Sequence, residues 1–144
     1  MSAAESTCAQ GCKRVTLLEE PLQALDTDRL AAALGPGDFL FIDSTHVVKT
    51  GSDVQWLLLR VLPALSPGVI IHIHDVHWPF EYPDSWIREG RDWNEAYFVH
   101  AFLAYNSRFR ILLFGDWLLA EHPEFVAPNN RASGSGSLWL EKVN

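Results

Sequence analysis

Two short apolar runs, each ending in a cluster of polar side chains, limit the possible folds of this chain more than any other feature. They are Phe39–Ile42 and Val69–Ile73. Runs of about four to eight apolar residues between turns are typical of strands buried on both faces of a parallel sheet. Gly-Pro-Gly precedes the first run and Ser-Pro-Gly precedes the second, so we expect each strand to begin at a turn.

Between the two runs, aliphatic residues recur with the spacing of one face of a helix. The stripe comprises Val54, Leu57, Leu58, Val61, Leu62 and Leu65. We expect Ser52 to cap this helix and Pro63 to bend or end its last turn. The crossover of a strand–helix–strand unit makes its two strands parallel and is right-handed in nearly all proteins. The carboxyl ends of both strands are therefore expected at one edge of the sheet.

Ionisable side chains follow both strands at that edge, where open α/β sheets bind their ligands. Asp43 and His46 follow the first strand, and His74, Asp75 and His77 follow the second. His46 and His77 are candidate general bases, because imidazole titrates near neutral pH. Asp43, His74 and Asp75 offer the carboxylate and imidazole ligands that divalent metal ions use. The structural alternatives are exposed loop histidines and, for the carboxylates, Asx turns.

The rest of the chain predicts three more strands, at residues 14–19, 109–114 and 138–141, and helices at 28–34 and 93–105. Asp26 or Thr27 can cap the first of these helices. His72 lies within the second apolar run, and we interpret it as a hydrogen-bonded core histidine. The segment at 76–93 is either a binding loop or a loop folded over its own aromatic residues.

Length, charge and motifs exclude several classes of protein. The 144 residues suit one domain, which we place at 14–144 after a loose leader at 1–13. The net charge of −7 disfavours a nucleic-acid partner. The sequence has neither a secretory signal nor an apolar run of the roughly 20 residues that cross a bilayer, so we expect a cytoplasmic protein without membrane contact. Cys8 and Cys12 are interpreted as reduced thiols.

Three segments resemble the C-terminal part of class I S-adenosylmethionine-dependent methyltransferases of the methyltransferase 24 type. They are GDFLFIDSTHVVKTGSDV, LPALSPGVIIHIHDVHWPFEYPDSWIREGRDWNEAYFVHAFLAYN and GSLWLEK. The resemblance covers roughly residues 14–142. It implies an α/β fold with a truncated Rossmann-like sheet, mostly parallel, with an antiparallel C-terminal edge and helices on its faces. The runs at 39–42 and 69–73 would be the fourth and fifth strands of that sheet.

The resemblance also assigns roles to residues at the strand ends. Related metal-dependent O-methyltransferases hold a divalent ion with an acid after the fourth strand and an acidic pair after the fifth. The matching positions here are Asp43, then His74 and Asp75, so a histidine replaces one acid and leaves the metal's identity open. A metal there would orient a substrate hydroxyl and lower its pKa. Asp43 is also the residue that we assign to cofactor binding.

One part of the family pattern is missing from the sequence. The glycine-rich first strand and turn, and the acid ending the second strand, hold the cofactor in that family, and this chain begins at what would be the third strand. We therefore expect half a cofactor site, and a partner in the form of a homodimer through exposed sheet edges or another chain with the missing half. The expected function is methyl transfer to a small molecule, with or without a metal. The alternatives are a non-catalytic domain that binds a ligand, metal or partner, and a metal-dependent hydrolase.

Overall fold

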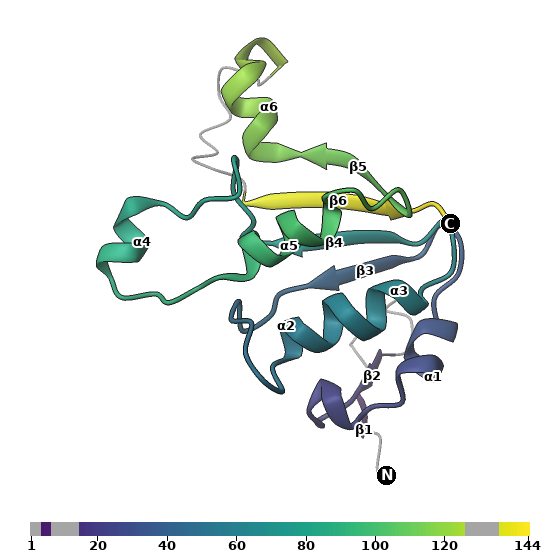
Figure 1. The fold of residues 1–144 in the computed structure, drawn as a ribbon. Coiled ribbons are helices and arrows are strands. Elements are labelled where there is room, and N and C mark those ends of the chain that lie inside the picture. The colour runs from purple at the N-terminus through teal and green to yellow at the C-terminus, as the bar shows by residue number, and fades with distance from the viewer. Residues whose placement is uncertain (1–3, 7–14, 126–135) are drawn as a thin grey trace.

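The computed structural model describes residues 4–6, 15–125 and 136–144, and its main feature is a four-stranded mixed sheet (Figure 1). The strands are β3 (Phe39–Ile42), β4 (Ile70–His74), β5 (Phe109–Phe114) and β6 (Ser137–Lys142). Their order in the sheet is β3-β4-β6-β5. The chain is thus an α/β protein, and these strands lie close to the ranges expected from the sequence.

The strand pairing corrects the expectation of a mostly parallel sheet. β3 and β4 are parallel, as their helical crossover requires, but β6 is antiparallel to both of its neighbours, β4 and β5. The C-terminal strand enters between β4 and β5 instead of extending the parallel series, and it returns beside β5 in the opposite direction. The antiparallel pairing of the last two strands is confirmed.

The N-terminal strand forms but does not join the main sheet within the described residues. β2 (Val15–Leu17) pairs antiparallel with β1 (Ala4–Ser6) in a separate two-stranded sheet. Most of the expected leader, residues 1–3 and 7–13, lies outside the described residues. After η1 (Leu22–Ala24), helix α1 (Thr27–Ala32) begins with the side chain of Asp26 accepting a hydrogen bond from the Arg29 amide at 3.1 Å.

The aliphatic stripe forms the expected crossover helix. It consists of α2 (Asp53–Trp56), the π-helical segment η2 (Leu57–Val61) and α3 (Leu62–Ala64). The Ser52 hydroxyl caps it by accepting a hydrogen bond from the Gln55 amide. Pro63 has no amide hydrogen for the carbonyl of Leu59, which accounts for a distorted turn just before it. The helix ends at Ala64, and both expectations about its ends are confirmed.

One face of the sheet packs on helices and forms the core. In Figure 1, α2, α3 and α5 (Glu95–Leu103) lie over this face. The core joins sheet and helix residues, including Ile42, Ile71, Ile73, Leu138, Leu140, Val54, Leu58, Val61, Leu62, Ala96 and Val99. Each fully buried aliphatic side chain of this kind stabilises the fold by roughly 1.5 to 3 kcal/mol.

The segment after β4 contains the short helix α4 (Asp84–Arg88) and packs on its own aromatic residues. Trp86 lies 5.1 Å from Trp93 and 6.4 Å from Tyr82 between ring centroids. The Arg91 guanidinium lies over both tryptophan rings. Of the two interpretations of this segment, the packing favours a loop folded over its own aromatic side chains.

The remaining described elements are α6 (Gly115–Glu121) and η3 (Pro123–Phe125), which follow β5. No helix within the described ranges is both long and apolar enough to cross a bilayer.

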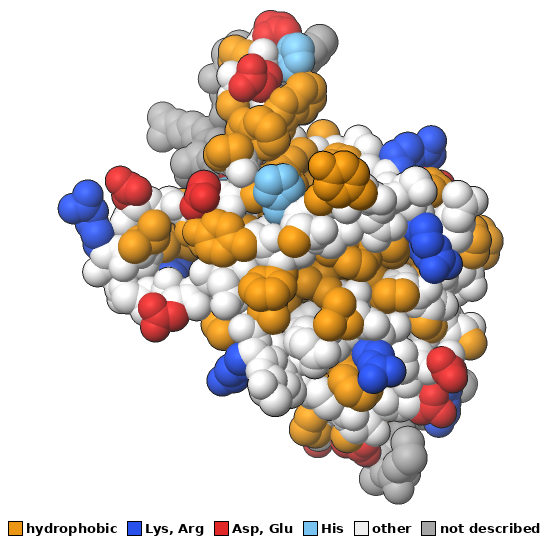
Figure 2. All heavy atoms as spheres, in the orientation of Figure 1, with side chains coloured by type: hydrophobic (Ala, Val, Ile, Leu, Met, Phe, Trp, Pro, Cys, Tyr) orange, Lys and Arg blue, Asp and Glu red, His pale blue; other side chains and the backbone are white. Residues whose placement is uncertain are grey.

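On the face drawn in Figure 2, the Lys and Arg side chains lie apart from one another.

Candidate functional site

Three strands end at one edge of the sheet, which we call the rim. β5 runs in the same direction as β3 and β4, because β4 and β5 are both antiparallel to β6. Asp43 follows β3, Asp75 follows β4 and Asp116 lies just after β5. The sequence predicted the first two positions, and the third depends on the strand order. The rim therefore carries a carboxylate beyond each of its three strand ends.

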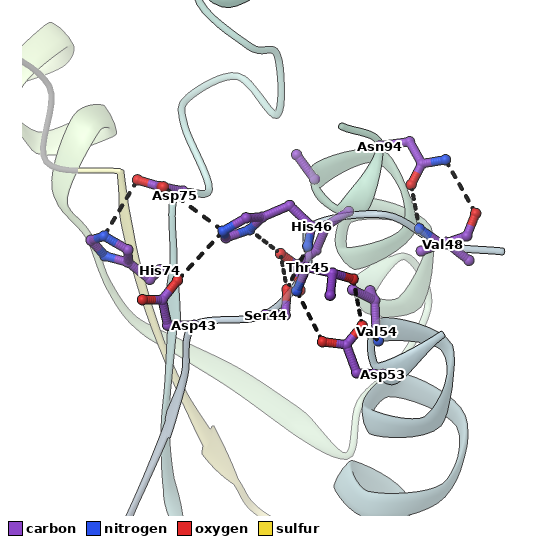
Figure 3. A network of polar contacts seen from close by, with 12 residues as sticks. Asp43, Ser44, Thr45, His46, Val48, Asp53, Val54, His74, Asp75 and Asn94 are labelled. Carbon is purple, nitrogen blue, oxygen red and sulfur yellow. Dashed lines mark hydrogen bonds and ion pairs between the residues drawn. The ribbon is translucent and has the colours of Figure 1, made fainter. Parts of the chain in front are cut away.

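His46 lies at the centre of the first cluster on the rim (Figure 3). Its Nε2 atom is 3.5 Å from Oδ1 of Asp43 and 3.9 Å from Oδ2 of Asp75. Its Nδ1 atom is 2.8 Å from Oε2 of Glu95, which is buried at the start of α5. The two strand-end carboxylates expected to meet are thus brought together, with an imidazole between them.

The charges around His46 determine its protonation. Burial opposes the charged form of its imidazole, but the hydrogen bond with Glu95 and the negative charges of Glu95, Asp75 and Asp43 outweigh burial and raise its pKa. The ring of Trp93 also packs against it, with centroids 4.1 Å apart. A raised pKa favours the imidazolium, which has no free lone pair, so His46 is better suited to holding carboxylates than to accepting a proton.

The loop that carries His46 is tied to α5 by its backbone. His46 has a positive φ of 57°, and its carbonyl oxygen accepts hydrogen bonds from the amides of Asn94 and Glu95. Ser44 donates its hydroxyl to Glu95 and accepts a bond from the His46 amide. The Asn94 side chain bonds both backbone groups of Val48. Because these contacts fix the loop, the strained backbone at His46 is held in place.

His77 forms a second and different cluster on the rim. Its Nδ1 atom is 2.7 Å from Oδ2 of Asp116, and both side chains are 12% exposed. The other carboxylate oxygen of Asp116 accepts a bond from the amide of Gly136. The Nε2 atom of His77 is buried and has no hydrogen-bond partner within the described part of the chain. A carboxylate on Nδ1 favours the tautomer that leaves Nε2 unprotonated.

Gly136 allows this arrangement. Its φ is +43°, and a Cβ atom there would lie 3.0 Å from Cε1 and 3.1 Å from Nε2 of His77. A larger residue would push against the imidazole. The indole of Trp86 contacts the same ring edge to face at 5.0 Å. The chain thus encloses the Nε2 atom of the His77 imidazole.

The two histidines of β4, His72 and His74, lie on the open face of the sheet. His74 is half-exposed, with Nε2 3.5 Å from Oδ1 of Asp75. His72 is buried and bonds the Ser137 hydroxyl through Nε2 at 2.8 Å, while burial and the neighbouring His74 lower its pKa. The expected core role of His72 agrees with this packing, although its Nδ1 atom is buried without a partner within the described residues.

The rim as arranged does not fit a divalent metal ion. His46 points its Nε2 atom at both Asp43 and Asp75, and its raised pKa favours a positively charged ring there. Within the described residues, no group of three or more His, Cys, Asp or Glu side chains is placed to hold a metal. The expected set of Asp43, His74 and Asp75 remains a prediction, and no step of the chemistry below depends on it.

Two site residues were not predicted as such from the sequence. Glu95 lies near the start of the helix expected at 93–105, and Asp116 lies two residues after the strand expected at 109–114. The available signal for Asp116 was similar to that for Asp43 and Asp75, an acid just after an apolar run. To assign Asp116 to the rim from this signal, one must know that β5 runs in the same direction as β4.

The comparisons with known proteins agree with the sequence resemblance. Residues 3–76, slightly more than half of the chain, match a family described as a methyltransferase domain. No curated protein and no solved structure gave a match. The matched range includes β3, the crossover helix and β4, so it contains the two strand ends that build the His46 cluster. On this match, the chain belongs to the methyltransferase domain family of the methyltransferase 24 type.

Proposed function

We propose that this domain takes part in S-adenosylmethionine-dependent methyl transfer to a hydroxyl group of a small molecule, with the rim as the reaction site. The observation that carries the proposal is the family match at residues 3–76, which ends at the rim residues Asp75 and Val76. Ligands of open α/β sheets bind beyond the carboxyl ends of the strands. In this chain the carboxylates of Asp43 and Asp75 lie there beside His46, and that of Asp116 lies beside His77.

The cofactor fits the rim in charge. When bound, S-adenosylmethionine supplies an electrophilic methyl group on a positively charged sulfur. The carboxylate of Asp43 is 58% exposed, so it is free to accept hydrogen bonds from hydroxyl or ammonium groups of the cofactor. The sequence has no glycine-rich strand and turn for the rest of the molecule, so we propose that a further chain completes the cofactor site.

His77 is the proposed general base. With Nδ1–H donated to Asp116, the Nε2 lone pair accepts the proton of the substrate hydroxyl as the oxygen bonds to the methyl carbon. The bound cofactor would supply the methyl group and leave as a neutral thioether. Because Nε2 is enclosed, the substrate reaches it after a local rearrangement of its neighbours.

His46 has a positioning role in this scheme. As an imidazolium it holds the carboxylates of Asp43 and Asp75 at the rim, and Glu95 holds the imidazolium. The two candidate general bases predicted from the sequence thereby receive different roles: His46 organises charge and His77 accepts a proton.

Isothermal titration calorimetry with S-adenosylmethionine tests the proposal directly. We expect weak binding by the wild-type chain, which holds only part of the cofactor site, and binding weakened by about a further tenfold in Asp43→Asn, because a charge-assisted hydrogen bond contributes roughly 1.5 to 3 kcal/mol. The matched control is Asp84→Asn, whose carboxylate is 88% exposed on α4 and lies 3.9 Å from the Arg88 guanidinium. Absence of heat from folded protein at ligand concentrations up to about 1 mM would contradict cofactor binding by this chain alone.

The same instrument separates the alternatives. Titration with Mg²⁺ and Zn²⁺, repeated on Asp75→Ala, tests the predicted metal set of Asp43, His74 and Asp75. If metal binds and S-adenosylmethionine does not, the rim supports a metal-binding domain or hydrolase instead. If the cofactor binds, the next measurement is transfer of a labelled methyl group to small hydroxyl compounds. Loss of this transfer in His77→Gln, with cofactor binding retained, supports His77 as the base.

A further inference from the structure

The two edge strands of the main sheet differ in how well they are protected. β5 forms one edge and β3 the other. β5 has a register irregularity between Ile111 and Leu113 and carries Arg110, which pairs with Glu141. Bulges and charges of this kind keep natural sheet edges from pairing with other chains. β5 therefore has the features of a sheet edge that is protected from pairing with another chain.

β3 has none of these features. Its four residues are all apolar, without charge, proline or bulge, and its outer edge has no strand partner within the described residues. It is also half of the parallel pair in this sheet, and parallel strands are usually covered on both sides by other elements. β3 therefore has the character of an interior strand placed at an edge.

The side chains of β3 extend this apolar character to the open face of the sheet. Phe39 and Phe41 are 63% and 62% exposed. Phe41 stacks on His72 with ring centroids 4.8 Å apart, and Phe39 contacts Trp139 edge to face at 6.2 Å. An aromatic row thus runs across the open face and stops at the unpaired edge, where covering it would remove apolar surface from water.

We propose that β3 pairs antiparallel with β3 of a second copy of this chain, about a twofold axis perpendicular to the sheet. In such a pair the same strand forms both sides of the interface, so its side chains must pack against their own copies. Twofold dimers are also the commonest oligomers. The β3 sequence, Phe-Leu-Phe-Ile, alternates faces and carries no charge, so the same strand serves both sides of the interface. The two sheets would join into one with their helices on the same side.

The alternation of side chains limits the register, and among the registers that it allows we propose the one centred on Leu40. Opposed residues must share a face, so an even-numbered residue lies opposite an even-numbered one. With Leu40 opposite the partner's Leu40, Phe39 lies opposite the partner's Phe41, and aromatic rings meet on the open face. A one-residue slip would place Asp38 opposite the partner's Asp43, two like charges, and would set core-facing residues against open-face residues.

This inference concerns assembly and does not depend on methyl transfer. Analytical ultracentrifugation of the full chain at concentrations up to about 100 µM tests it. We expect a dimer in the wild-type chain and at least about a tenfold weaker association in Phe41→Lys, because a lysine opposite an aromatic ring removes the apolar contact. The matched control is Leu112→Lys, whose side chain on β5 is 46% exposed.

A wild-type chain that stays monomeric throughout overturns the proposal. So does a dimer that Leu112→Lys dissociates as strongly as Phe41→Lys, since the contact would then lie at β5. Should Phe41→Lys not fold, a cysteine crosslink replaces it: Leu40→Cys in a chain with Cys8→Ser and Cys12→Ser. The Asp38 carbonyl accepts a bond from Ile70 on β4, so Leu40, two residues on, also directs its backbone toward β4. Leu40 and its counterpart would therefore form a non-hydrogen-bonded pair, with Cα atoms about 4.5 Å apart and within reach of a disulfide. A crosslinked dimer on a non-reducing gel supports the register, and its absence in a dimeric chain overturns it.

Discussion

His46 and His77 lie on the same rim, yet their surroundings suit opposite tasks. His46 faces three carboxylates, and both of its nitrogen atoms lie near acceptors. His77 faces the carboxylate of Asp116 with one nitrogen, and the other has no hydrogen-bond partner within the described residues. In the proposed scheme, the three carboxylates around His46 suit it to the role of a cation, and the single carboxylate on Nδ1 of His77 leaves its Nε2 atom for the substrate.

This difference also bears on the metal expected from the family resemblance. A divalent ion at strand-end carboxylates neutralises their charge and fixes their positions. In this protein the His46 imidazolium, a side chain of the protein itself, neutralises the charge of Asp43 and Asp75 and fixes their positions. The cluster consequently depends on Glu95 and on the loop between β3 and α2, whereas the His77 pair depends on Asp116 and on the close approach of Gly136.

The largest expected effect is that of removing the buried acid of the His46 cluster. Glu95→Ala should lower the free energy of unfolding by about 3 to 5 kcal/mol, because it leaves a buried imidazolium and the Ser44 hydroxyl without their partner. Urea unfolding measures the change. Glu89→Ala, at a carboxylate that is 54% exposed, is the control and should stay within about 0.5 kcal/mol. A loss below about 1 kcal/mol for Glu95→Ala would mean that the cluster is not charged as described.

The sequence predicted the strand-end residues but not their division into two clusters. Strand ends and the crossover helix followed from apolar runs and helical spacing, which are local signals. The position of β6 between β4 and β5 is set by tertiary pairing, and it brings Asp116 and Gly136 beside His77. The contact between Glu95 and His46 joins residues 49 positions apart, and no spacing rule encodes it.

A second prediction concerns the His77 cluster through its glycine. Gly136→Ala should lower the free energy of unfolding by about 2 kcal/mol, from its positive φ and from the clash of the new Cβ with His77. Gly90→Ala is a matched control, since Gly90 has a φ of +81° and nothing within 4 Å of a new Cβ. The difference between the two variants, about 1 kcal/mol, measures the contacts of the new Cβ with the His77 imidazole and with the Asp75 Cα atom, 3.2 Å away. Equal losses would show that both neighbours move away freely.

The smallest expected effect is a pH dependence that distinguishes the two histidines. Because the pKa of His46 is raised in the folded chain, its stabilising contribution is fully present below the unfolded value of about 6.5 and is lost as the pH rises through the folded pKa. Urea unfolding between about pH 5.5 and 8.5 should show this decline in the wild-type chain, by at most about 1.4 kcal/mol for each pH unit between the two pKa values. His46→Gln should flatten the decline, while His100→Gln, at an exposed histidine on α5, should leave it unchanged. If His46→Gln retained the full decline, the carboxylates at the rim would be held by some other group, and the comparison between the two histidines would lose its physical basis.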